Sequence, residues 1–449
     1  METSAIFKAY DVRGTYPDQL DERVVRALGS AFADFVGEGP LVVARDMRPS
    51  GEALCRAFAD GARARGVSVI DLGLASTDFL YFASGYVNAP GAMFTASHNP
   101  AQYNGVKLTL AGAKPVGVES GLREIEAATN AYFLAPAEGP LADFSSRDLL
   151  SEWVAHVHSF VDVTALRPLK VVADTANGMG GYVAPKVFAG LPFDVEYLYE
   201  ELDGTFPNHP ADPLNPANLL DLQRRVLDAG ADVGLAFDGD ADRVFLIDER
   251  AQPISGSTTT AMVAHAMLAR HPGATVLYNL ICSKSVPEVI TEAGGVGVRT
   301  RVGHSYIKQV MAETGAIFGG EHSGHYYFRD NYRADSGIIT ALVVLELLSA
   351  FDGPLSELVK PYQRYRDSGE INTEVRDPLA TVERVAAIVA QRGAVLDRLD
   401  GLTADFGSWW FNLRASNTEP LLRLNLEADS PEALEVHVRS MLDLLKEEA

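Results

Sequence analysis

The hexapeptide Thr95–Pro100 places a hydroxyl nucleophile, Ser97, directly before a histidine. The apolar run at 89–94 predicts a buried strand, and the proline that closes the hexapeptide restricts Asn99 to extended or turn conformations. Ser97 is therefore expected on a loop that leaves a sheet. Serine, asparagine and proline are also ordinary turn residues, so the hexapeptide by itself fits a polar turn as well as a nucleophile loop.

Three carboxylates alternate with small residues at Asp238, Asp240 and Asp242, between two apolar runs typical of strands. Carboxylates at this spacing suit a hard divalent cation, and they repel one another unless a cation joins them. A calcium loop of the EF-hand type would use the same positions with Glu249. It requires glycine where the chain has Arg243, and a strand-like run follows where a helix should begin. The spacing predicts a magnesium-like site, with a solvated acidic turn as the alternative.

Two further polar loops suit a phosphorylated sugar. Glu321, Ser323 and His325 follow an apolar run and can hydrogen-bond a polyhydroxylated ligand or move a proton. A metal site built from Glu321 and His325 is the alternative, but the flanking glycines favour a loop over the helix that would align them. The second loop begins at Arg414 and combines a guanidinium with neutral donors, which suits a phosphate dianion and also fits a polar turn. These donors are Ser416, Asn417 and Thr418.

Together, and in this order, the four segments resemble the α-D-phosphohexomutase family, particularly its bacterial phosphomannomutase/phosphoglucomutase branch. The resemblance covers essentially the whole chain, because shorter stretches between the four segments are also similar to family motifs. These stretches are 7–14, 45–51, 103–107 and 302–305.

The resemblance implies a phosphoserine enzyme that acts on hexose phosphates. Ser97 would carry a phosphoryl group, and one Mg²⁺ would be held by that phosphate and the three aspartates. Lys107 and Arg243 would neutralise charge during phosphoryl transfer. Ser97 would phosphorylate the free hydroxyl of a hexose monophosphate. The resulting hexose 1,6-bisphosphate, expected as intermediate and activator, would turn round and return its other phosphate, so that the phosphoryl group moves between O1 and O6.

The resemblance also implies a general base and a set of substrate contacts. Candidates for the base are Lys107, Arg13, His304 and His325, and the sequence leaves this choice open. A lysine base would need a lowered pKa, which acidic surroundings oppose. The expected contacts to the sugar and its non-reacting phosphate are Tyr10, Arg301, Glu321, Ser323, Arg414, Ser416, Asn417 and Thr418.

Mannose and glucose phosphates are the expected substrates. In the phosphoglucosamine mutase branch of the family that this chain resembles, glutamine usually stands at the position of His322. The resemblance therefore favours mannose and glucose phosphates as substrates. Phosphoglucosamine mutase remains the alternative. A metal-dependent phosphatase would use the same serine and aspartates but would not need the Arg414 loop. A non-catalytic sugar-phosphate sensor would not need Ser97.

Composition limits the partners and the setting. The net charge of −22 disfavours nucleic acid and anionic membranes, because their phosphates would be repelled. The chain has no apolar run long enough to cross a membrane, and its start lacks the basic and apolar regions of a signal peptide. Cys55 and Cys282 have no disulfide or metal spacing, which fits a reducing compartment. We expect a cytoplasmic protein, a monomer or weak homodimer.

A strand, helix and return strand recur three times along the chain, beginning near residues 41, 169 and 274. A different pattern follows, with a strand at 370–375, another at 407–414 and a last helix at 431–446. We expect three related mixed α/β domains and a smaller α+β C-terminal domain around a central cleft. The predicted domains are 1–143 with the serine loop, 144–252 with the metal loop, 253–365 with the sugar loop and 366–449 with the phosphate loop.

Overall fold

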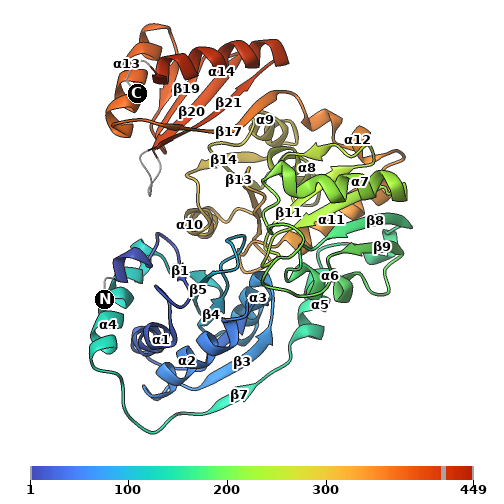
Figure 1. Cartoon of the computed structure of the whole chain (residues 1–449). Helices are drawn as coiled ribbons and strands as arrows, with labels where there is room; N and C mark the ends of the chain where they lie inside the picture. Colours follow the sequence, from blue (N-terminus) through green and yellow to red (C-terminus); the bar gives the residue numbers. More distant parts are fainter. Residues whose placement is uncertain (1–2, 416–420, 447–449) are drawn as a thin grey trace. The chain divides into compact units, whose positions relative to one another are not determined.

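The computed structural model describes residues 3–415 and 421–446 (Figure 1). The chain divides into two compact units, each described by itself. The first comprises Met1–Ser255, Met311–Gly315 and Ser323–Leu358, and the second comprises Gly256–Val310, Ala316–His322 and Val359–Ala449. Short 3-10 helices occur at η1 (Thr3–Ala5), η2 (Val118–Ser120), η3 (Val163–Ala165), η4 (Pro216–Leu219) and η5 (Lys360–Tyr362).

The first sheet of the first unit carries the serine loop. Its order is β1-β5-β4-β2-β3-β7, with β6 paired to β5; β2 lies parallel to β3 and β4, and β5 runs antiparallel to β1 and β4. The strands are β1 (Val12–Thr15), β2 (Leu41–Arg45), β3 (Val69–Leu74), β4 (Gly91–Phe94), β5 (Tyr103–Leu110), β6 (Lys114–Pro115) and β7 (Phe144–Ser146). The helices are α1 (Glu22–Val36), α2 (Gly51–Arg63), α3 (Thr77–Val87) and α4 (Leu122–Leu134). Apolar faces of α1, α2 and α4 pack with β2 and β4 in one core, which fixes the sheet that positions the loop.

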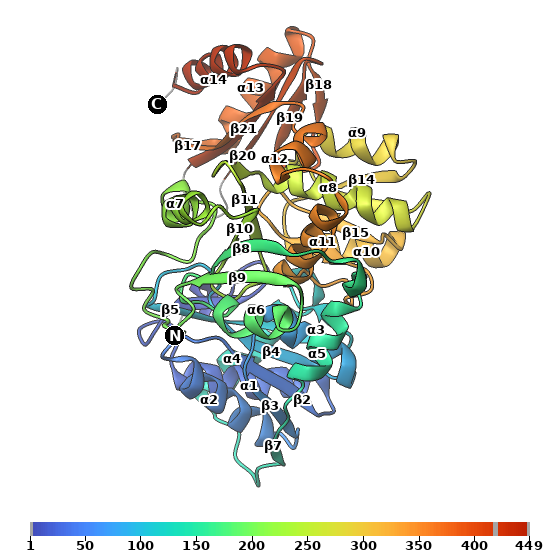
Figure 2. The same cartoon turned by 90° about the vertical axis from the view of Figure 1, so that its right-hand side faces the viewer.

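The second sheet carries the acidic loop and has the order β12-β11-β10-β8-β9. Its strands are β8 (Leu169–Asp174), β9 (Phe193–Leu198), β10 (Val233–Phe237), β11 (Val244–Asp248) and β12 (Pro253–Ile254). Helices of this region are α5 (Leu150–His158), α6 (Gly180–Phe188) and α7 (Leu220–Ala229), and Figure 2 shows α6 beside β9. β10 pairs parallel with β8 and antiparallel with β11, so the acidic loop is a hairpin connection between two fully buried strands.

The first unit ends with β16 (Tyr326–Phe328), α11 (Gly337–Ala350) and α12 (Leu355–Leu358). α11 is apolar on nearly all sides because it packs against both α5 and β11. Within the described ranges, no single helix is long and apolar enough to cross a membrane; only α11 together with the segment Leu355–Tyr362, across a sharp bend, passes that test.

The second unit begins with an α/β layer in which β13 pairs parallel with β14 and β15. Its elements are α8 (Gly256–Arg270), β13 (Thr275–Asn279), α9 (Ser285–Glu292), β14 (Val296–Thr300), α10 (His304–Thr314) and β15 (Phe318–Gly320). Four residues at the end of α10 belong to the first unit.

An antiparallel sheet of order β17-β21-β20-β19-β18 completes the second unit. Its strands are β17 (Arg366–Glu374), β18 (Val395–Asp397), β19 (Leu402–Asp405), β20 (Trp409–Ala415) and β21 (Leu421–Ala428). The helices α13 (Pro378–Gln391) and α14 (Pro431–Lys446) cover one face of this sheet and share its core (Figures 1 and 2).

The structure confirms the predicted fold class of three related α/β layers followed by an α+β layer. The predicted last helix coincides with α14. The strand predicted near 407–414 corresponds to β20, which begins at Trp409 because Gly407, with a φ of 87°, turns the chain between β19 and β20. The N–H of Gly407 donates to the Asp405 carboxylate, which stabilises this turn.

Candidate active site

Ser97 lies on the loop between β4 and β5, as the sequence predicts. Its φ is 49°, a left-handed conformation that costs a non-glycine residue about 1–3 kcal/mol and so requires support from the surroundings. The N–H of Ser97 donates to Thr95 Oγ1 at 2.9 Å. The Ser97 hydroxyl donates to Asp238 Oδ2 at 2.8 Å, and its side chain is buried.

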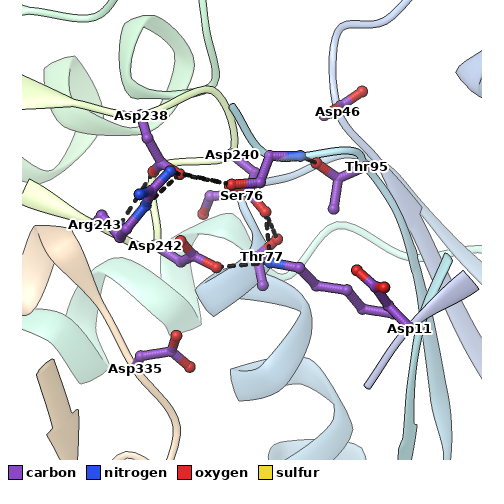
Figure 3. A network of polar contacts seen from close by, with 12 residues as sticks. Asp11, Asp46, Ser76, Thr77, Thr95, Asp238, Asp240, Asp242, Arg243 and Asp335 are labelled. Atoms are coloured by element: carbon purple, nitrogen blue, oxygen red, sulfur yellow. Dashed lines mark hydrogen bonds and ion pairs between the residues drawn. The ribbon is translucent and has the colours of Figure 1, made fainter. Parts of the chain in front are cut away.

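The three aspartates of the acidic loop converge on this hydroxyl. In Figure 3, Asp238, Asp240 and Asp242 extend from the loop after β10, and each offers an oxygen within 4.8 Å of the others. All three are at most 1% exposed. Gly239 permits the close approach of the two loops, because a Cβ there would lie 2.4 Å from the carbonyl oxygen of Ser97.

The N-terminus of α3 also supports this loop. The Thr77 N–H donates to the Asp240 carbonyl at 3.1 Å, and its hydroxyl donates to Asp240 Oδ2 at 2.6 Å. The neighbouring Asp78 is buried and accepts hydrogen bonds from the hydroxyls of Ser76 and Ser336. Burial outweighs these bonds and raises the pKa of Asp78 to about 7.

Two buried cations offset part of the negative charge. Lys107, on β5, places Nζ 2.8 Å from Asp240 Oδ2 and 2.7 Å from Asp242 Oδ2. Arg243 pairs with Asp238 Oδ2 at 2.9 Å (Figure 3). Burial opposes the charge of Lys107, but its two carboxylate partners outweigh burial and hold its pKa well above the usual value. Three carboxylates and two cations leave a net charge of −1.

The acidic loop fits a divalent cation. Asp240 Oδ1 and Asp242 Oδ1 are buried and have no hydrogen-bond partner among the described residues, which costs free energy unless a cation contacts them. Carboxylate oxygens are the ligands that Mg²⁺ prefers, and a phosphorylated Ser97 would add nearly two negative charges beside them. Burial raises the pKa of Asp238 well above its usual value, although the partner Arg243 lowers it. A bound cation would oppose this rise in the pKa.

His98 is a contact that the sequence did not assign to the site. Its Nδ1 lies 2.7 Å from Arg243 Nη2 and 3.2 Å from the Ser97 hydroxyl. Burial, and then the charge of Arg243, lowers its pKa to about 2, so His98 is a neutral acceptor at physiological pH. Its position next to Ser97 was the only signal in the sequence, and this signal does not distinguish a site residue from a turn residue.

Among the remaining predicted residues of the first unit, His325 and Arg13 lie beside this centre. His325 Nε2 lies 3.7 Å from Asp242 Oδ1 and 4.0 Å from Asp335 Oδ2. Ser323 Oγ lies 3.1 Å from His325 Nδ1. Arg13, on β1, donates to Asn99 Oδ1 at 2.7 Å and so contacts the serine loop. Tyr10 is half-buried on the segment before β1.

Of the predicted substrate contacts of the second unit, Glu321 and Arg301 follow strands β15 and β14, and Arg414 lies within β20. Glu321 is buried and accepts from Asn279 Nδ2 at 3.2 Å and from the Gly303 N–H at 3.1 Å. Arg414, at the end of β20, lies 3.4 Å from a Glu370 oxygen. Arg301 is exposed. Ser416, Asn417, Thr418 and the side chain of His304 lie outside the described residues.

Comparison with known proteins covers the whole chain. The phosphoglucomutase/phosphomannomutase family models match four stretches: domain I at 4–135, domain II at 151–252, domain III at 255–365 and the C-terminal domain at 365–443. A relative from Xanthomonas campestris described as "Phosphohexose mutases" is 40% identical over 99% of this chain and all of its own length. A phosphomannomutase of Escherichia coli K12 is 38% identical over the full length of both chains.

A solved structure agrees with these matches. The crystal structure of a phosphoglucomutase/phosphomannomutase family protein from Burkholderia thailandensis has a TM-score of 0.89 and 32% identity, over 99% of this chain and 98% of that one. Identity and coverage at these levels show common ancestry as well as a common fold. The chain is therefore a phosphohexomutase that belongs to the phosphoglucomutase/phosphomannomutase family.

Proposed function

We propose that this enzyme interconverts the 1- and 6-phosphates of mannose and of glucose through a phosphorylated Ser97 and a hexose 1,6-bisphosphate. The observation that carries this proposal is the contact at 2.8 Å between the Ser97 hydroxyl and Asp238, inside a buried cluster with a net negative charge. The phosphomannomutase relatives support the mannose substrate, and the phosphoglucomutase members of the family support glucose.

The residues that would hold Mg²⁺ are Asp238, Asp240 and Asp242, together with the phosphate on Ser97. When bound, the cation supplies charge neutralisation for the transferring phosphoryl group. Arg243 lies 3.5 Å from the Ser97 hydroxyl through Nη2, where its guanidinium can stabilise the charge that develops on the serine oxygen.

Each half-reaction is a phosphoryl transfer. The bond between phosphorus and Ser97 Oγ breaks, and a bond forms between phosphorus and the free sugar hydroxyl, whose proton passes to a base. The bisphosphate then presents its other phosphate to Ser97, and the reverse transfer restores the phosphoserine. No phosphate is consumed over the cycle.

We assign the general base to His325. Lys107 is the weaker candidate, because two carboxylates within 2.8 Å keep it protonated, and a protonated amine cannot accept a proton. A guanidinium such as Arg13 remains protonated in proteins. His325 has a partly exposed side chain beside Asp242, where an imidazole can reach a substrate hydroxyl.

The non-reacting part of the substrate would contact residues chosen by resemblance. By resemblance, Glu321 and Ser323 would bind sugar hydroxyls, and Arg414 with Ser416, Asn417 and Thr418 would bind the distal phosphate. Tyr10 and Arg301 are further expected substrate contacts. The predicted domain boundaries, the monomeric or weakly dimeric state and the cytoplasmic location stay predictions.

The test is to incubate the enzyme with Mg²⁺, a trace of glucose 1,6-bisphosphate and, in turn, the 1-phosphates of mannose, glucose and glucosamine. Production of the 6-phosphate and of inorganic phosphate is followed. We expect 6-phosphate from the first two substrates, and no turnover by Ser97→Ala. Preferred conversion of the glucosamine substrate would identify a phosphoglucosamine mutase. Release of inorganic phosphate without isomerisation would identify a phosphatase, and either result would refute the proposal.

A further inference from the structure

The guanidinium of Arg48 is buried beneath the serine loop and contacts its backbone at four points. Nη2 donates to the carbonyls of Ser97 at 2.9 Å and Asn99 at 2.6 Å. Nη1 donates to the carbonyls of Pro100 at 2.9 Å and Tyr103 at 2.8 Å. Arg48 is 2% exposed, so these bonds are shielded from water. One side chain thus binds both ends of the loop that carries the nucleophile.

Arg48 is itself held in place from two sides. Asp46 accepts the Arg48 N–H at 2.9 Å and forms an ion pair with its Nε at 3.3 Å, and both side chains are fully buried. The ring of Phe206 lies 5.2 Å from the guanidinium carbon. Gly204 lets this second segment approach, because a Cβ there would lie 2.6 Å from the Arg48 Cα. The guanidinium is therefore fixed before any substrate binds.

The serine loop requires this support. Ser97 has a left-handed φ, which is unfavourable for a residue with a side chain and persists only where surrounding contacts impose it. A planar guanidinium presents its donors in a fixed fork, so its four bonds orient four carbonyls at once. An ammonium has three rotatable donors and a point charge, and cannot replace this pattern.

We propose that Arg48 is a positioning residue for phosphoryl transfer, which fixes the backbone of the serine loop so that the Ser97 oxygen faces the acidic loop. Arg48 acts through Ser97, because its described hydrogen bonds are directed to the loop backbone. The inference rests on the proposed role of Ser97 as phosphoryl carrier. A small displacement of a reacting oxygen, on the order of 1 Å, lowers a rate by about 10²-fold.

The test compares Arg48→Ala and Arg48→Lys with Arg63→Ala. Arg63, at the end of α2, also binds a backbone carbonyl and a carboxylate, those of Ala142 and Asp60, but contacts no residue of the serine loop in the described structure. Dephosphorylated enzyme is mixed with glucose 1,6-bisphosphate, and phosphate on Ser97 is followed by intact mass. Near-UV circular dichroism reports the folded fraction, and kcat and KM are measured with glucose 1-phosphate.

We expect wild type and Arg63→Ala to be phosphorylated at equal rates. For both Arg48 variants we expect a phosphorylation rate and a kcat about 10²-fold lower per folded molecule, with KM within about threefold of wild type. Guanidinium ions at millimolar concentration should raise the phosphorylation rate and kcat of Arg48→Ala at least about tenfold. They should not raise those of Arg48→Lys, because the lysine side chain fills the space that the ion would occupy.

Three outcomes overturn the inference. If folded Arg48→Ala or Arg48→Lys gains phosphate at the wild-type rate, the loop does not need this guanidinium. If neither variant folds, Arg48 has a role in stability alone. If wild type gains no phosphate on Ser97, the proposed function fails and the inference falls with it, whereas the first two outcomes leave the proposed function intact.

Discussion

Replacing Lys107 by methionine removes the cation that two buried carboxylates share. The Lys107 side chain is 10% exposed, and those of Asp240 and Asp242 are 0% and 1% exposed, so water cannot compensate for its loss. Removal of one partner of a buried ion pair costs about 3–5 kcal/mol. A loss of 1 kcal/mol lowers the unfolding midpoint by about 2–4 °C in domains of about 150–250 residues. Lys107→Met should therefore lower the unfolding midpoint of the metal-free protein by about 6–20 °C.

Mg²⁺ should reverse much of this effect. The variant cluster has a net charge of −2 instead of −1, so a divalent cation binds it more strongly and stabilises the native state by mass action, about 2.7 kcal/mol at a concentration of 100 Kd. We therefore expect Mg²⁺ to raise the unfolding midpoint more in Lys107→Met than in wild type. The measurement is differential scanning calorimetry in EDTA and in saturating Mg²⁺.

Lys114→Met is the matched control, since Lys114 is an exposed lysine of the same sheet and its loss should change stability by less than about 0.5 kcal/mol. The reasoning is refuted if Lys107→Met in EDTA unfolds at the same temperature as this control. An equal Mg²⁺-induced rise in wild type and in Lys107→Met would also contradict it.

Three more perturbations test the same centre. Gly239→Ala would place a Cβ 2.4 Å from the Ser97 carbonyl oxygen, so kcat should fall on the order of 10²-fold. The control Gly139→Ala, whose new Cβ has its nearest contact at 3.4 Å, should keep wild-type kinetics. Equal kcat values for the two variants would contradict the close approach at Gly239. The pKa of Asp78 is about 7 in the native state against an ordinary value of 3.8. Between pH 3.8 and about 7 the native state therefore holds a proton on Asp78 that the unfolded state has lost. The free energy of unfolding should fall as the pH rises through this window, by up to about 1.4 kcal/mol per pH unit. Calorimetry across this window should show that slope reduced in Asp78→Asn; an unchanged slope would exclude Asp78 as its source. Asp240→Asn should weaken Mg²⁺ binding at least about tenfold in isothermal titration, and unchanged affinity would remove Asp240 from the ligands.

Local patterns in the sequence were sufficient for the elements that carry the site. Alternation of apolar runs with turn residues predicted the strand before Ser97 and the strands on both sides of the acidic loop, because a strand buried on both faces must be apolar throughout. The last helix was predicted at its observed bounds, since its apolar face repeats with the helical period. The short strand β19 was not predicted, because only two of its four residues are apolar and the strand signal is correspondingly weak.

Contacts between distant segments could not be read in this way. The partner of Ser97 is 141 positions away, the partners of Lys107 are 133 and 135 away, and Arg48 binds carbonyls 49 to 55 positions further on. Backbone carbonyls leave no mark in the sequence, so a buried arginine that binds them is indistinguishable there from one on the surface.

The sequence by itself determined which chemical groups the chain brings to its active site: one hydroxyl, three carboxylates at alternating positions and the cations near them. Only the tertiary structure decided that Lys107 neutralises two of these carboxylates, that His98 is a neutral acceptor and that Arg48 holds the serine loop. The physical reason is that residue type and spacing fix local conformation and available chemistry. Charge pairing, burial and the resulting pKa values depend on strand order and register, which bring together segments from different parts of the chain.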